Sequence, residues 1–100
     1  MAVDHSSEPW TFTADADAYD PGHPIYVSKI VLLAGATAGE IEVTNGSGGK
    51  VLARETLTAQ DMFVVPIMAW LTSGGIFIED LVAGGQVQVY TGKRRVFMVD

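Results

Sequence analysis

The sequence contains no cysteine and only two histidines among its 100 residues. Without cysteine the chain cannot form a disulfide framework, a thiolate nucleophile or a zinc–thiolate site. Both histidines lie near the start of the chain, His5 in a polar stretch and His23 between Gly22 and Pro24, where a turn is expected. The two could bind a metal ion together only if this part of the chain folded to bring them close. An ordinary surface or packing role is the simpler interpretation.

Basic residues are also scarce, because six Lys and Arg are set against twelve Asp and Glu, a formal net charge of −6. Binding to nucleic acid requires clustered Lys and Arg. The only such cluster, Lys93-Arg94-Arg95, is short and flanked by apolar residues. The longest uncharged apolar stretch, Ile30 to Gly39, is far shorter than the ~20 residues that span a bilayer. The opening residues MAVDHSSEPW are acidic and polar, unlike a signal peptide, so neither nucleic acid nor membrane is a predicted partner.

Apolar residues make up 48% of the chain, and its glycines recur in turn signals about every ten residues. This length and composition predict one packed domain. Short apolar, β-branched runs lie between turns such as Asn45-Gly46 and Ser73-Gly74-Gly75, and no run has helical spacing. The fold class is therefore predicted as all-β, a small antiparallel β-sandwich, jelly-roll-like, of seven or eight short strands. A small barrel or a plainer sandwich is the alternative. Strands are expected near residues 10–13, 25–33, 40–44, 51–56, 62–70, 76–78, 86–89 and 96–99.

Residues 1–24 differ from the rest of the chain in being rich in Asp, Ser, Pro and His. We predict an extended N-terminal arm here, with one short strand that places Trp10 and Phe12 on the same side. Residues 25–100 are predicted to form a single β-sandwich domain that ends in an apolar tail, Val96 to Val99. Pro66 indicates that the strand near 62–70 lies at a sheet edge or contains a bulge.

Two of the expected strands are apolar on both faces. Residues 30–33 are all aliphatic, and in residues 62–68 Met62, Val64 and Met68 alternate with Phe63, Val65 and Ile67. A two-layer sandwich buries only the inner face of each sheet, so the outer faces of these strands need a second cover. Another subunit would supply it in a homodimer or homotrimer, whereas in a monomer the arm would fold back over its own domain.

The series Asp15, Asp17 and Asp20 is the only acidic cluster that is a candidate for a cation site. Calcium takes 6 to 8 oxygen ligands, and three carboxylates close in sequence could supply some of them. The spacing does not fit an EF-hand, so a solvated acidic loop is the preferred interpretation, and no metal or cofactor is predicted.

No catalytic arrangement is evident. No serine lies in a nucleophile-elbow motif, and Lys50 after the glycine-rich loop is followed by a strand pattern instead of the helix start of a phosphate loop. Glutamates at positions 40, 42, 55 and 79 could pair as glycosidase acids, but Glu40 and Glu42 alternate with apolar residues as on a solvated strand face. We predict that the protein is not an enzyme.

Aromatic residues could instead form a sugar-stacking platform, as in carbohydrate-binding β-sandwiches. Aromatic side chains also fill sandwich cores and anchor protein interfaces, and spacing does not separate these uses. We favour core and interface roles for Trp10, Tyr19, Tyr26, Trp70 and Tyr90.

Three stretches carry a resemblance to a known group of proteins: SKIVLLAGATAGEIEVTNGSGGKVLARE, MFVVPIMAW and GGQVQVYTG. Together they make Tyr26 to Gly92, about two thirds of the chain, similar to small virion proteins of tailed bacteriophages. The resemblance implies a β-sandwich that decorates or cements the capsid. Such a subunit binds the outer shell as a dimer or trimer where capsomers meet. Residues 1–24 and 96–99 have no counterpart in the family pattern.

We therefore expect a structural virion protein, made in the host cytoplasm and bound to the capsid exterior, whose partner is the major capsid protein. A carbohydrate- or receptor-binding module of a phage tail or fibre is the alternative. It would use an exposed aromatic platform and a calcium loop at the three aspartates named above. The residues expected at interfaces are Trp10, Phe12, Tyr19, Val31, Leu33, Phe63, Val65, Phe97 and Met98.

Overall fold

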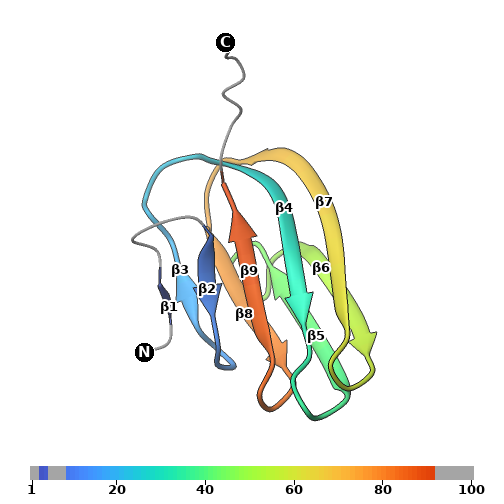
Figure 1. The fold of residues 1–100 in the computed structure, drawn as a ribbon. Coiled ribbons are helices and arrows are strands. Elements are labelled where there is room, and N and C mark those ends of the chain that lie inside the picture. The colour runs from blue at the N-terminus through green and yellow to red at the C-terminus, as the bar shows by residue number, and fades with distance from the viewer. Residues whose placement is uncertain (1–2, 5–8, 92–100) are drawn as a thin grey trace.

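The computed structural model describes residues 3–4 and 9–91, which form two antiparallel sheets packed face to face (Figure 1). The five-stranded sheet has the order β1 (Val3–Asp4), β2 (Trp10–Phe12), β9 (Gln86–Tyr90), β4 (Ile25–Leu33) and β7 (Met62–Leu71). The four-stranded sheet has the order β3 (Ala18–Tyr19), β8 (Ile76–Leu81), β5 (Gly39–Thr44) and β6 (Val51–Leu57). Within these residues there is no helix that could cross a membrane. The prediction of an antiparallel β-sandwich is confirmed.

The strands pair in a nested order. β2 pairs with β9, β3 with β8, β4 with β7, and β5 with β6, so strands from the two ends of the chain lie together and the middle strands form a hairpin. This nesting is divided between the two sheets, so each sheet combines strands that are distant in the sequence. The expected strands at 25–33 and 62–70 match β4 and β7 closely, whereas the expected strand at 96–99 lies outside the described residues.

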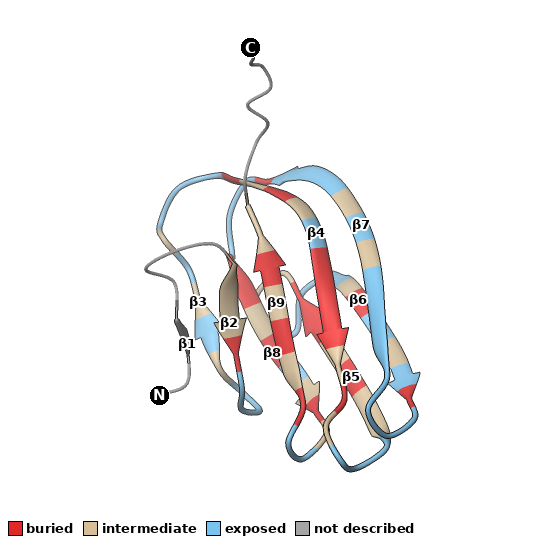
Figure 2. Cartoon of the chain, in the orientation of Figure 1, coloured by how far each residue is buried: buried red, intermediate tan, exposed pale blue. Residues whose placement is uncertain are grey.

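The core lies between the sheets and follows the alternation of the strands (Figure 2). In β4, Val27, Ile30 and Leu32 are fully buried. They belong to the same core cluster as Ile41 and Val43 of the second sheet, which are also fully buried. A bulge shifts the register of β4 against β7 between Val27 and Lys29, which explains why the buried positions change from odd to even along this strand.

The N-terminal segment is part of the sandwich and is not an arm from residue 9 onward. Phe12 pairs with Val87 in the five-stranded sheet and is fully buried in the core. A few residues later, the backbone N–H of Ile78 donates to the Asp17 carbonyl over 2.9 Å, at the edge of the other sheet. The predicted arm over residues 1–24 is wrong for these positions because their backbone completes both sheets.

The loops at one end of the sandwich are joined by Asn45. Its backbone N–H donates to the Lys50 carbonyl over 2.8 Å and closes the predicted β5–β6 hairpin, in which Gly46 has a φ of 86°. Its side-chain Nδ2 donates to the carbonyls of Ser73 and Gly75, over 2.8 and 2.7 Å. Asn45 therefore ties the β7–β8 turn to the β5–β6 hairpin.

Pro66 lies in β7, which is the last strand of its sheet, next to a bulge in which Ile67 and Met68 lie opposite the single residue Ser28 of β4. Beside it, Met68 adopts a φ of 52°, a left-handed conformation that is uncommon for this residue type. The sequence-based expectation of an edge or a bulge at Pro66 is confirmed on both counts.

Candidate interaction surface

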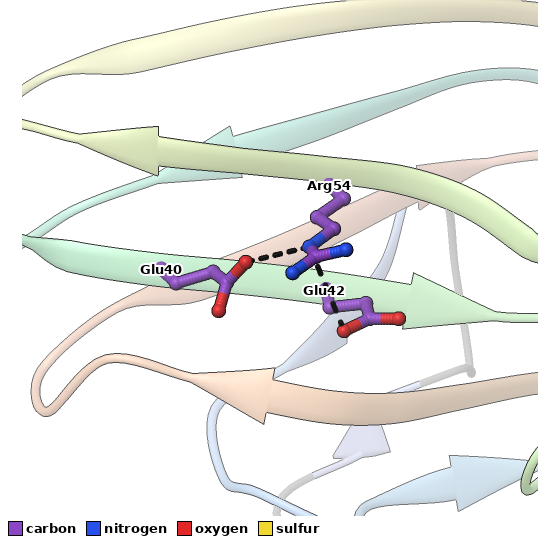
Figure 3. A network of polar contacts seen from close by, with 3 residues as sticks. All are labelled: Glu40, Glu42 and Arg54. Carbon is purple, nitrogen blue, oxygen red and sulfur yellow. Dashed lines mark hydrogen bonds and ion pairs between the residues drawn. The ribbon is translucent and has the colours of Figure 1, made fainter.

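The outer face of the four-stranded sheet is charged. Arg54 of β6 lies over β5, where its Nε is 2.6 Å from Glu40 Oε2 and 3.9 Å from Glu42 Oε1 (Figure 3). The hydrogen bond to Arg54, followed by its positive charge, lowers the pKa of Glu40, and the same contacts raise the pKa of Arg54. A carboxyl group that is held ionised on an open sheet face is a poor general acid. Glu40 and Glu42 therefore do not have the arrangement of the two carboxyl groups in a glycosidase site.

A third carboxyl group, Asp80 of β8, shares this face. Its pKa is raised, mainly by burial and then by the negative charge of Asp15 and contacts with Glu40. A carboxyl whose pKa is higher in the folded than in the unfolded state opposes folding when ionised, and the opposition disappears as the pH falls below both pKa values. Asp80 therefore destabilises the fold at neutral pH but not in strong acid.

We expect Asp80→Asn to raise the urea midpoint of unfolding at pH 7 and to leave it unchanged at about pH 2, where aspartate is protonated in both states. The matched control is Glu55→Gln on neighbouring β6, which removes one charge outside this cluster. An Asp80→Asn midpoint that is equal to or below that of the parent chain at pH 7 would contradict the assignment.

The glycine-rich hairpin loop also carries a carboxylate. Glu79 accepts a hydrogen bond from the Gly48 backbone N–H over 2.9 Å, beside the carbonyl of Gly46, which accepts from the Gly49 N–H. A negatively charged side chain bound to the loop amides occupies the position that an anion would need. The loop is a hairpin connection, as the sequence suggests, and not a phosphate cradle.

The outer face of the five-stranded sheet has a polar half on β9. Gln88 Nε2 donates to Gln86 Oε1 over 3.1 Å, and the Tyr90 hydroxyl donates to Gln88 Oε1 over 3.4 Å. Lys29 of β4 places its Nζ 4.7 Å from the centre of the Tyr90 ring, within cation–π range. This ladder of contacts orders the polar half of the face.

The other half of this face is apolar. The pairing register places Leu33 opposite Met62, Val31 opposite Val64, and Tyr26 opposite Trp70, whose rings meet edge to face 5.6 Å apart. Directly opposed residues share a face, and Val31, although only 6% exposed, is not in the core cluster, so this face is the outer one. We call it the β4–β7 face, made of Tyr26, Val31, Leu33, Met62, Val64 and Trp70.

The exposed apolar side chains of this face lie mainly on β7 (Figure 2). Met62, Val64 and Trp70 are 59%, 44% and 57% exposed, and five of the six exposed large hydrophobic residues in the described chain belong to this strand. Exposed apolar patches with a polar rim mark interaction sites. Within the N-terminal segment, Trp10, His23 and Pro24 line a hollow together with Tyr26 and Trp70, at the end of this face.

The structure places the expected interface residues in different environments. Val31 and Leu33 lie on the β4–β7 face, where Val31 is buried and Leu33 is half-buried. Trp10 and Tyr19 are partly buried against the core, with ring centres 4.9 Å apart across the two sheets. Phe63 is 42% exposed at the sandwich edge.

Two expectations in this set are wrong. Phe12 is fully buried, and Val65 is packed against the core opposite the fully buried Ile30. Both side chains point into the space between the sheets, where Phe12 is completely buried and Val65 is partly buried. Phe97 and Met98 lie outside the described residues.

The aspartates of the candidate calcium loop differ in their surroundings: Asp17 Oδ2 is buried without a hydrogen-bond partner in the described part of the chain, whereas Asp20 binds a backbone amide. Asp20 Oδ1 accepts from the Gly22 N–H over 2.9 Å, forming a turn. Among the residues described, no three His, Asp or Glu side chains are close enough to hold a metal ion. His23 Nδ1 is 3.0 Å from the Pro24 carbonyl, and His5 lies outside the described residues.

Met62 and Val64 were not among the expected contacts, whereas Trp70 was given a core or interface role from the sequence. The alternation along β7 separates its two apolar faces but does not say which faces outward. Lys29 gives a usable signal: a charged residue on β4 points to solvent, so Val31 and Leu33, at even spacing from it, also face outward. Their partners on β7 then follow from the pairing.

No protein-family model matches this chain, and comparisons with curated proteins and with solved structures gave no match. The fold and the β4–β7 face are therefore the basis for a functional assignment.

Proposed function

We propose that this protein is a structural virion protein of a tailed bacteriophage, a capsid decoration or cement subunit that binds the outer shell and bridges adjacent capsid proteins. The observation that carries the proposal is the unequal character of the two outer faces. The β4–β7 face is apolar and exposed, whereas the opposite outer face carries the Glu40–Arg54 ion pair. A subunit that binds with one sheet and meets solvent with the other needs this arrangement.

The composition of the β4–β7 face supports binding without catalysis. Trp, Tyr and Met are enriched in protein interfaces, and aromatic residues often dominate the binding energy. The acidic net charge of −6 suits the outside of a particle that holds DNA. Many weakly bound copies on one shell gain strength from multivalency. The protein would be made in the host cytoplasm and act as a homodimer or homotrimer on the capsid exterior.

The proposal predicts that Met62→Lys/Val64→Lys turns a dimer or trimer into a monomer, measured by light scattering behind a sizing column. Losing two apolar contacts and burying charge should raise the dissociation constant at least about 30-fold, which corresponds to about 2 kcal/mol. The same variant should fail to bind empty shells of the major capsid protein from the same phage.

The matched control is Ala18→Lys/Thr56→Lys, two exposed positions on the outer face of the other sheet. It should keep both the oligomer and shell binding. A parent chain that is monomeric at every concentration and does not bind shells would contradict the proposal.

A second candidate function is a carbohydrate- or receptor-binding module of a phage tail or fibre. It is favoured by a hollow of about 250 Å³ whose lining includes Trp10, Tyr26 and Trp70. Aromatic rings beside a hollow can stack on sugar rings. Glycan binding that disappears in Trp70→Ala while the oligomer persists would favour this candidate, and the absence of glycan binding by the parent chain would remove it.

A further inference from the structure

The free edge of β7 is the longest strand edge at the end of a sheet in the described part of the molecule. β7 has ten residues and ends the five-stranded sheet, whereas β1, β3 and β6 at the other sheet ends have two, two and seven (Figure 1). Open edges pair with other chains, and proteins protect them with short strands, charged side chains, proline or bulges. In β6, Glu55 lies opposite the fully buried Ile41 and so points inward, which is one such protection. The longer, apolar edge of β7 needs another.

The phase of the β4–β7 ladder shows which backbone groups of β7 face outward. The N–H of Ala34 donates to the Asp61 carbonyl over 2.9 Å, so the backbone of Asp61 is turned toward the neighbouring chain segment. Successive residues of an antiparallel strand turn their N–H and C=O groups alternately to one side and to the other. The register has no shift from Met62 to Pro66. The backbone groups of Met62, Val64 and Pro66 therefore face the free edge.

Two of these three outward positions offer no donor. The Met62 N–H is already bonded to Asp61 Oδ1 over 2.9 Å, and the Thr58 hydroxyl donates to Asp61 Oδ2 over 3.5 Å. Pro66 has no N–H. Between residues 62 and 66, only the Val64 N–H is left for an added strand. Such a strand would find no donor for the carbonyls that it turns toward Met62 and Pro66, and a buried carbonyl without a donor is unfavourable.

The bulge interrupts the rest of the edge. Ile67 and Met68 lie opposite the single residue Ser28, and Met68 has a φ of 52°. A left-handed residue breaks the extended repeat, and a bulge increases the local twist of the strand. Beyond the bulge, β7 contains only the three residues Ala69 to Leu71, which is short for a stable pairing. The first part of the edge thus lacks donors, and the second part lacks length.

We propose that Asp61 and Pro66 close the edge of β7 to strand addition, so that other proteins contact this strand through its side chains on the β4–β7 face. This narrows the kind of partner. A folded surface with apolar side chains fits the face, whereas an extended peptide does not fit the edge. The inference does not rest on the function proposed above, because the backbone closes the edge whether or not the protein belongs to a virion.

Amide hydrogen exchange in the unmodified protein, followed by NMR, is the first test. The Val64 amide faces the free edge and should exchange at least about 10-fold faster than the Phe63 and Val65 amides, which face β4. The difference should not depend on protein concentration, because a contact through the β4–β7 face leaves the edge uncovered. Equal protection of the three amides would overturn the proposal, since it would mean that a strand already pairs with this edge.

The second test restores the missing donors. Asp61→Ala frees the Met62 N–H, and Pro66→Val adds an N–H. This double variant should form thioflavin-binding aggregates at least about 10-fold faster than the parent chain, because its apolar edge can then pair with other copies. The matched control is Asp61→Asn/Pro24→Val. It also removes one charge and one proline, but it keeps an acceptor oxygen at position 61 and the proline at position 66, so it should aggregate at the parent rate.

The aggregation rates are compared at a temperature at which circular dichroism shows all three chains to be folded. Equal rates for the double variant and its control would contradict the proposal. If the double variant does not fold, the exchange test on the unmodified chain decides the question. A chain that is monomeric and does not bind capsid shells would still show both expected results, so the failure of the proposed function is distinguishable from the failure of this inference.

Discussion

Phe12→Ala is expected to lower the free energy of unfolding by about 3–5 kcal/mol, measured by urea denaturation. Phe12 is fully buried and is the residue through which β2 enters the core, opposite Val87. Its removal would leave a cavity lined by strands of both sheets. Domains of this size have a total stability of about 5–15 kcal/mol, so the variant would lose a large share of it.

The control for this prediction is Thr13→Ala at the adjacent exposed position, which should change stability by less than about 0.5 kcal/mol. Deleting residues 1–20 should unfold the domain, because the deletion removes both β2 and β3. A Phe12→Ala effect below about 1 kcal/mol would mean that the segment is a separate arm after all.

The second large effect is expected for Gly75→Ala, at about 2–4 kcal/mol of lost stability and a fall of at least about 10 °C in the thermal midpoint. Gly75 has a φ of 63°, which disfavours any residue with a Cβ. An added Cβ would also lie 2.6 Å from Asp20 Cα and closer still to the Tyr19 carbonyl oxygen. Both neighbours are backbone at the end of β3 and cannot move without breaking its pairing with β8.

Gly48→Ala separates the two causes. Gly48 has a similar φ of 71°, but a Cβ there would meet no atom within 4 Å. This control carries only the conformational strain and should cost about 1 kcal/mol. If the two alanine variants had equal thermal midpoints, the close approach of β3 to Gly75 would have no energetic effect.

The sequence predicted the elements whose signal is local. A high content of Ile, Val and Leu identified the strand at 25–33, and Asn45-Gly46 identified the hairpin between β5 and β6. It did not predict the pairing of residues 9–19 with strands near the far end of the chain. β3 has only two residues, Ala18 and Tyr19, so no periodicity marks it. Polar composition suggested an arm because the short strands lie among loop residues.

The candidate surface was predicted only in part, because part of its signal is local and part depends on long-range strand pairing. Residues 30–33 and 62–68 are apolar on both faces. This pattern identified the two strands whose outer faces need to be covered. Choosing the outward face of β7 requires the register with β4, which is a long-range property. A single-residue change of register would exchange Val64 for Val65 on the surface, and the local sequence is apolar in both cases.

The nested strand order also governs how this chain folds. β9 lies in the middle of its sheet, between β2 and β4, so that sheet is in two parts until Tyr90 takes its place. During synthesis, a ribosome-bound chain that lacks residues 86–90 cannot join Phe12 to its neighbours. Folds with such distant partners close slowly, on the order of milliseconds to seconds. Until then the apolar strands β4 and β7 are exposed to pairing with other copies of the chain. Nascent chains at high local concentration would therefore be prone to aggregate.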